Sequence, residues 1–124
     1  MTPKVLIVDD DSDIRRLVRL YLETMHQCDI READHGLAAI KYLMEEKFQL
    51  LITDLFMRPM NGLELVAFVK RTAGFEKLPI IMLTSNGEER DRDRALQLGV
   101  NDYLLKPFYP SKIGPLIEKH LAAS

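Results

Sequence analysis

Short apolar runs alternate with longer segments of helical periodicity along the whole of this chain. The run 5–8 (Val-Leu-Ile-Val) is followed by apolar residues at spacings of three and four between Ile14 and Met25. An apolar run followed by that period predicts a strand and then an amphipathic helix. The same succession occurs five times, so we expect an α/β fold in which a helix connects each strand to the next.

Four more strand and helix pairs follow the first. A weaker strand is expected through Ile30, and clearer ones at 48–53, 79–83 and 103–105. The third run is apolar on both faces, which is typical of a central parallel strand. Because crossovers between parallel strands are almost always right-handed, we predict a flavodoxin-like, doubly wound (βα)5 fold whose five-stranded parallel sheet has the order 2-1-3-4-5.

Length and composition limit the alternatives. A chain of 124 residues with 47% hydrophobic content predicts a single domain over 1–124 with one core. A formal charge of −2 without a basic stripe argues against direct binding to nucleic acid. The single cysteine, Cys28, cannot form an internal disulfide, and there is neither a secretory pattern nor a long apolar run. We therefore expect a cytoplasmic protein that does not insert into membranes.

Polar and charged residues stand where four of the predicted strands end: Asp9 and Asp10, Asp54, Thr84, and Lys106. In open parallel sheets ligands bind outside the carboxyl ends of the strands, and strands one and three meet at the switch point of the predicted order. Three carboxylates in one crevice would repel one another, so the set calls for a cation. Oxygen ligands beside a lysine favour Mg²⁺ and a phosphoryl group over zinc or haem.

These residue types permit phosphoryl chemistry on a carboxylate. An aspartate carboxylate that is held by a divalent cation and faces a phosphoryl donor can form an acyl phosphate. Lys106 would place a point charge on a phosphoryl oxygen, and Thr84 would offer a hydroxyl to another. Singly, each residue is also a common helix cap or turn residue. The three histidines are scattered, and we interpret them as partly exposed surface residues: His26, His35 and His120.

The ordered motifs resemble the receiver domain of two-component response regulators over essentially the whole chain. The acidic pair Asp9-Asp10, the segment 54–62 (Asp-Leu-Phe-Met-Arg-Pro-Met-Asn-Gly), Thr84, Tyr103 and the step Lys106-Pro107 carry this resemblance. It implies that Asp54 takes a phosphoryl group from a sensor histidine kinase or a histidine phosphotransfer protein. The domain would not be an enzyme beyond its own phosphorylation and dephosphorylation.

The resemblance also implies a metal site and a switch. Asp10, Asp54 and the main-chain carbonyl of Phe56 would bind Mg²⁺ directly, with Asp9 acting through water. Phosphate would draw Thr84 inward and Tyr103 would rotate into the vacated space. The face formed by helix four, strand five and helix five would then change its affinity for a downstream protein.

Helix four has the sequence of a weakly held element. The charged run 88–94 opens it, and few apolar residues anchor it, which places it at the low-stability end of a fold. The alternative is a solvated charged helix beside a tyrosine that caps an edge strand. Homodimer formation, and whether the chain is a stand-alone receiver or the front of a longer regulator, are left open.

Four local features depart from the family pattern or stay undecided. Pro59 comes one place later than usual, which moves the backbone restriction onto Arg58. Phe56 replaces a smaller or polar side chain; either its ring, with Asn86, shields the acyl phosphate from water, or it packs on the surface loop. Lys106-Pro107 can be cis or trans. Pro115 implies that the last helix either begins near it or is kinked.

Two other functions fit parts of the pattern. Asp9-Asp10-Asp11 contains the Asp-x-Asp that a dehalogenase-like phosphatase carries on its first strand, but Asp54 would then lack a role, and such enzymes usually need a cap domain. A flavin-binding module on the same fold would need a phosphate-binding loop after strand one, where this chain has acidic residues.

Overall fold

The computed structural model describes residues 2–25, 27–85 and 87–122. Strands and helices alternate strictly through these ranges, as the sequence predicts. The elements are β1 (Lys4–Val8), α1 (Ser12–Met25), β2 (Asp29–Ala33), α2 (Gly36–Glu45), β3 (Leu50–Asp54), α3 (Gly62–Arg71), β4 (Ile80–Thr84), α4 (Glu89–Leu98), β5 (Asp102–Leu105) and α5 (Pro110–Ala122). None of the described helices is both long enough and apolar enough to span a bilayer.

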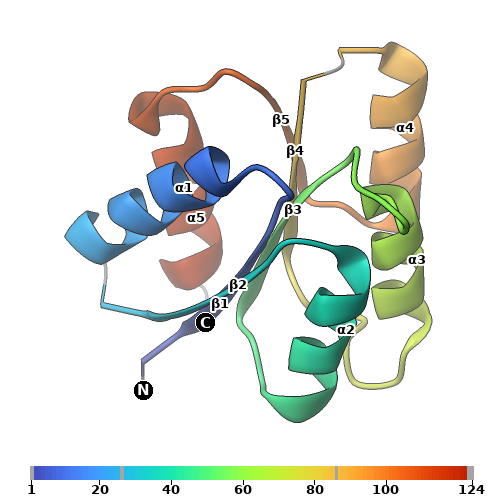
Figure 1. The fold of residues 1–124 in the computed structure, drawn as a ribbon, viewed down its shortest axis with the longest axis horizontal. Helices are drawn as coiled ribbons and strands as arrows, with labels where there is room; N and C mark the ends of the chain where they lie inside the picture. Colours follow the sequence, from blue (N-terminus) through green and yellow to red (C-terminus); the bar gives the residue numbers. More distant parts are fainter. Residues whose placement is uncertain (1, 26, 86, 123–124) are drawn as a thin grey trace.

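The five strands form one parallel sheet in the order β2-β1-β3-β4-β5, which confirms the predicted flavodoxin-like topology. Helices cover both faces of this sheet: α1 and α5 lie on one side, and α2, α3 and α4 on the other (Figure 1). Because all strands run in the same direction, their carboxyl ends share one edge. β1 and β3 lie side by side at the centre of that edge.

β3 is the middle strand of the sheet and is buried on both faces. All five of its residues are buried. Leu51 packs in the apolar layer beneath α2, α3 and α4, while Leu50 and Ile52 pack in the layer beneath α1 and α5. Neither face of the strand is exposed to solvent, as its continuous apolar sequence predicts. Asp54, at its end, is therefore carried by a strand that is fixed from both directions.

Side-chain caps begin the helices next to this edge. Asp11 accepts a hydrogen bond from the Asp13 amide at 2.9 Å where α1 begins. Asn61 accepts from the Glu64 amide at 2.9 Å, and Glu64 accepts from the Asn61 amide at 3.0 Å, which forms a capping box at the start of α3. These bonds fix the loops that follow β1 and β3.

The last two helices differ in how they are anchored. Ala95 is the only buried residue of α4, and Leu96 is 41% exposed, as expected for a weakly held helix. α5 runs continuously from Pro110 through Pro115, so the alternative that it begins near Pro115 is wrong. The Arg58-Pro59 and Lys106-Pro107 peptide bonds are both cis. Of the two conformations left open for Lys106-Pro107, the structure therefore has the cis form.

Two of the three histidines have structural roles. His35 caps α2, where its Nδ1 accepts a hydrogen bond from the Ala38 amide at 3.1 Å. His120 is partly exposed, as predicted, and its Nε2 lies 2.6 Å from Asp102 Oδ2, so it ties α5 to the start of β5. His26 lies outside the described residues.

Candidate functional site

The predicted site residues come together at the carboxyl edge of the sheet. Asp9 follows β1, Asp54 and Thr84 end β3 and β4, and Lys106 follows β5. Asp9, Asp54 and Thr84 are buried, with exposed fractions of 0%, 4% and 0%. The amide of Lys106 donates to the Thr84 carbonyl at 2.7 Å, so the sheet ladder itself holds the lysine beside β4.

Lys106 bridges two buried carboxylates. Its ammonium nitrogen Nζ lies 2.8 Å from Asp9 Oδ2 and 3.1 Å from Asp54 Oδ1. The lysine side chain is itself only 15% exposed. One ammonium therefore faces two carboxylates where little water can screen them, which makes each of these charge-assisted hydrogen bonds stronger than a surface ion pair.

Every polar atom of Asp9 has a partner. Its amide donates to the Ala33 carbonyl at 3.1 Å, and its own carbonyl accepts from Arg15 Nη1 at 2.6 Å. Its carboxylate accepts from the Asp11 amide at 2.9 Å and from Lys106 Nζ at 2.8 Å. Asp9 is thus the fixed member of the acidic pair. The contact with Arg15 was not predicted, since nothing in the sequence separates this arginine from its neighbours on α1.

The site is electrostatically short of positive charge. Burial raises the pKa of Asp54 to about 6; the Asp9 carboxylate adds to this rise and Lys106 opposes it. Burial also raises the pKa of Asp9. For Lys106, burial acts to lower the pKa, but the hydrogen bond that its ammonium donates to Asp9 and the charges of the two carboxylates outweigh burial, and the pKa is raised. The lysine stays charged, yet one ammonium does not balance the acidic set.

A third carboxylate completes this cluster. Oxygen atoms of Asp9, Asp10 and Asp54 all lie within 4.8 Å of one another. Asp10 is exposed, whereas the other two are buried. Carboxylate oxygens at this separation, open to solvent on one side, fit a small hard cation such as Mg²⁺, which keeps several of its waters. Phe56, whose carbonyl is the remaining predicted ligand, has a side chain that is 49% exposed.

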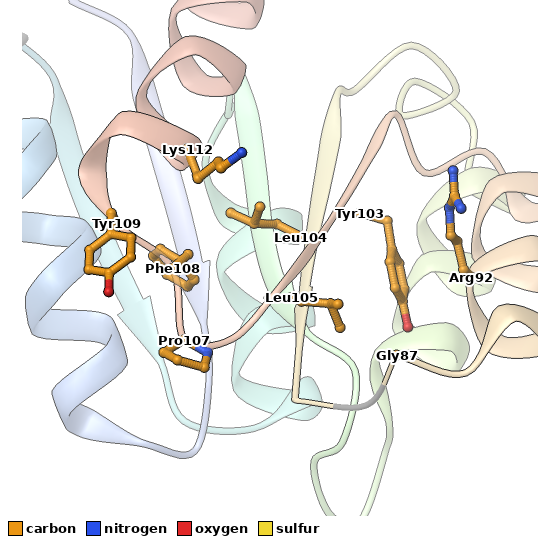
Figure 2. Close-up of a pocket in the computed structure, with 9 residues that line it drawn as sticks. All are labelled: Gly87, Arg92, Tyr103, Leu104, Leu105, Pro107, Phe108, Tyr109 and Lys112. Atoms are coloured by element: carbon orange, nitrogen blue, oxygen red, sulfur yellow. The ribbon is translucent and has the colours of Figure 1, made fainter.

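The two predicted switch residues lie in contact. Burial raises the pKa of the Tyr103 phenol, while a hydrogen bond with the Thr84 side chain acts in the opposite direction. Figure 2 shows the Tyr103 ring between β5 and α4, with its hydroxyl near Gly87 and its edge toward Arg92. An open pocket of about 480 Å³ runs from there along β5 to the start of α5. The site and the predicted output face are therefore connected through one pair of side chains.

Comparisons with known proteins agree with this geometry. Residues 5–118 match the family model described as the response regulator receiver domain. A chemotaxis protein CheY homologue of Campylobacter jejuni is 41% identical over 93% of this chain and 89% of its own length. The transcriptional regulatory protein SrrA of Staphylococcus aureus is 36% identical over 91% of this chain, but over only 45% of its own length.

A solved structure shares the fold as well as part of the sequence. The response regulator receiver protein from Pseudomonas putida superposes with a TM-score of 0.89 at 34% identity, covering 96% of this chain and 98% of that one. The family match spans nearly all of the chain, and oxygen atoms of Asp9, Asp10 and Asp54 cluster within it. The chain therefore belongs to the response regulator receiver domains of two-component signalling systems.

Proposed function

We propose that this receiver domain accepts a phosphoryl group from a phosphohistidine onto Asp54, with Mg²⁺, and passes the change to another protein through its α4, β5 and α5 face. The observation that carries the proposal is the placement of Lys106 between buried Asp9 and Asp54, beside a third carboxylate. The donor would be a sensor histidine kinase or a histidine phosphotransfer protein.

Each residue has a defined part in the transfer. A carboxylate oxygen of Asp54 attacks phosphorus, the bond between phosphorus and the donor imidazole nitrogen breaks, and its electron pair returns to the imidazole. Asp54 needs no general base, since a carboxylate with a pKa of about 6 is mostly ionised at pH 7. Lys106 already lies 3.1 Å from Asp54 Oδ1, so its ammonium can move to a phosphoryl oxygen without a large rearrangement.

The carboxylates of Asp10 and Asp54 and the carbonyl of Phe56 are the proposed direct ligands of Mg²⁺, and Asp9 would act through water. When bound, the metal supplies positive charge that offsets the repulsion between the carboxylates and the incoming phosphate. Asp9 suits an indirect role because its carboxylate already accepts from Lys106 and the Asp11 amide. Asp10 is exposed and so can reach the ion from the solvent side.

The same pair of side chains supports the proposed readout. Thr84 ends β4 at the site, and its hydrogen bond to Tyr103 reaches toward the pocket along β5. Moving the Thr84 hydroxyl to a phosphoryl oxygen would break this bond and release the tyrosine. Tyr103 then alters a surface whose α4 side has one buried anchor, Ala95. A downstream protein that contacts this face would bind one of the two states preferentially.

The phosphatase alternative is less well supported. Its Asp-x-Asp pair would be Asp9 and Asp11, but the Asp11 carboxylate is occupied with capping α1, at 2.9 Å from the Asp13 amide. Asp11 is also not part of the carboxylate cluster, whereas Asp54 is. The acidic cluster likewise disfavours a bound flavin phosphate, because three carboxylates would repel it. The domain is thus proposed to modify itself once rather than turn over a substrate.

Phosphoramidate tests the proposal because its phosphorus is bonded to nitrogen, as in phosphohistidine. Incubation with Mg²⁺ should add one phosphoryl group to the intact protein, and Asp54→Asn should add none. Released inorganic phosphate in large excess over protein, from an added phosphoester, would support a phosphatase instead. The proposal fails if wild type gains no phosphoryl group, or if Asp54→Asn gains as much as wild type.

A further inference from the structure

We propose that Arg15 is a positioning residue for the metal site, because it holds the main-chain carbonyl of Asp9 and so fixes the peptide group from which Asp10 extends. The inference rests on the proposed Mg²⁺ site and adds to it a residue from outside the acidic cluster. It concerns how the site is shaped, not which atoms bind the ion.

Arg15 joins α1 to the turn after β1 and to β2 at once. Its Nη1 donates to the Asp9 carbonyl at 2.6 Å, and its Nε donates to Glu32 Oε1 at 2.9 Å. The side chain is 18% exposed. A guanidinium can make both bonds because its donors form a rigid planar fork.

Glu32 anchors that fork. Its second oxygen, Oε2, accepts from Arg19 Nε at 2.6 Å, so the carboxylate is held by two arginines from α1. Glu32 lies on β2, paired in register with Ile7 of β1. The anchor is therefore part of the sheet, and the position of Arg15 is set by the sheet and not by a mobile loop.

The acidic pair differs sharply in how its two members are held. Asp9 is bonded through all four of its polar atoms, whereas the Asp10 carboxylate makes no hydrogen bond or ion pair within the part of the chain that the structure describes. The direction of Asp10 is thus determined by its backbone. Arg15 restrains the carbonyl of the Asp9-Asp10 peptide, and this pre-orders the free carboxylate toward the cation.

Position and charge predict opposite effects at Arg15. If only its positive charge mattered, removing it would strengthen the binding of a cation nearby. If it positions the Asp9-Asp10 peptide, removing it would weaken binding. Glu32, at 2.9 Å, opposes much of the arginine charge, so we expect the positioning effect to dominate. The sign of the change therefore separates the two explanations.

Titration calorimetry with Mg²⁺ alone, on unphosphorylated protein, measures this sign. Arg15→Gln should weaken Mg²⁺ binding about tenfold, which is the lower end of the range expected when a residue that orients a metal ligand is lost. Arg15→Lys should weaken it too, because one ammonium cannot replace a fork that spans Glu32 and the Asp9 carbonyl. The Asp10 amide resonance of the metal-free Arg15 variants should also shift in NMR spectra.

A neighbouring arginine on α1 provides a matched control. Arg16→Gln removes the same charge from an exposed side chain one residue along the helix. It should bind Mg²⁺ within about twofold of wild type. If Arg15→Gln does not fold, Arg15→Lys decides the question. Wild-type affinity or tighter binding in the folded Arg15 variants overturns the inference; failure of wild type to bind Mg²⁺ overturns the proposed function itself.

Discussion

Asp54 affects both the stability of the fold and the chemistry of the site. Its pKa of about 6 means that, without metal, the folded protein binds more protons than the unfolded chain between about pH 4 and pH 6. Stability therefore falls as the pH rises through this window. Above it, the ionised buried carboxylate costs the fold a free energy on the order of 2 kcal/mol, which bound Mg²⁺ would offset.

Asp54→Asn should stabilise the metal-free protein for this reason. We expect a gain on the order of 2 kcal/mol in the free energy of unfolding at pH 7, and little gain below about pH 4, where Asp54 is protonated in both states. Urea unfolding with a chelator at the two pH values measures the difference. Asp93→Asn, at an exposed carboxylate, is the control and should change little. A variant that is less stable than wild type at pH 7 would contradict the electrostatic account.

Phe56 should protect the acyl phosphate. Its ring is 49% exposed and lies two residues after Asp54, so it can cover the phosphoryl group from solvent. Phe56→Asn is expected to lose the phosphoryl group faster than wild type, measured as the decay of phosphorylated protein by intact mass after the donor is removed. Leu37→Asn, at another half-exposed apolar side chain, should leave the lifetime unchanged. Equal lifetimes for wild type and Phe56→Asn would favour the alternative in which the ring only packs on the loop.

Single residues also show where sequence reasoning stops. The strand-end residues Asp9, Asp54 and Lys106 could be placed together because the topology brings strand ends to one edge. Arg15 could not be singled out, because Arg15, Arg16 and Arg19 lie on the same helix and only the contacts of the folded protein show which of them reaches the Asp9 carbonyl. The contact between His120 and Asp102 could not be predicted either, because the two residues are distant in sequence.

Among the elements, the turn between β3 and α3 is the most tightly constrained part of the site. The Gly62 amide donates to the Leu55 carbonyl at 2.7 Å. A Cβ at Gly62 would collide with the Asp54 carbonyl oxygen and lie 2.9 Å from the Cα of Leu55. These neighbours are backbone atoms, so they cannot swing aside as a flexible side chain would. Only glycine lets α3 begin this close to the end of β3.

Gly62→Ala should therefore disturb both stability and metal binding. We expect a loss of about 1–3 kcal/mol in unfolding free energy, together with weaker Mg²⁺ binding, because the clash pushes on Asp54 itself. Gly87→Ala is the matched control, since its Cβ would meet the Leu105 methyl groups at an ordinary 3.5 Å. If Gly62→Ala has the same unfolding free energy and the same Mg²⁺ affinity as wild type, the turn is more adaptable than this account requires.

α3 and α4 offer an internal comparison, because each has ten residues. The buried residues of α3 are Gly62, Leu65, Val66 and Val69, whereas α4 buries Ala95 alone. Amide hydrogen exchange should therefore be faster in α4 than in α3 when both are measured in the unphosphorylated protein. Equal protection would remove the argument that α4 is the easily displaced side of the output face. The charged run at its start predicted this weakness, while the continuity of α5 through Pro115 could not be predicted.

For the molecule as a whole, periodicity and handedness were sufficient to predict the fold. Five apolar runs separated by helical segments leave few topologies, and right-handed crossovers select the order that the sheet adopts. The predicted site follows from that order, because β1 and β3 are neighbours only in a sheet that switches direction there. Hydrogen bonds between distant elements, such as that from Arg15 to Asp9, depend on side-chain paths that periodicity does not encode.

We propose that the whole molecule is modified covalently at one residue and responds by changing its binding at one surface. Asp54 and Thr84 lie at the carboxyl edge of the sheet, and Thr84 is hydrogen-bonded to Tyr103, which lines the pocket along β5. Because the input is a single acyl phosphate, every proposed change at the output face depends on modification of one carboxylate. The identity of the modified residue is therefore the central claim.

Peptide mass spectrometry after incubation with acetyl phosphate tests this claim most directly. Wild type, treated with and without Mg²⁺, should carry one phosphoryl group only when the metal is present, on the peptide that contains Asp54, and Asp54→Asn should carry none. A phosphoryl group on another residue, or one that forms equally well without Mg²⁺, would contradict the account.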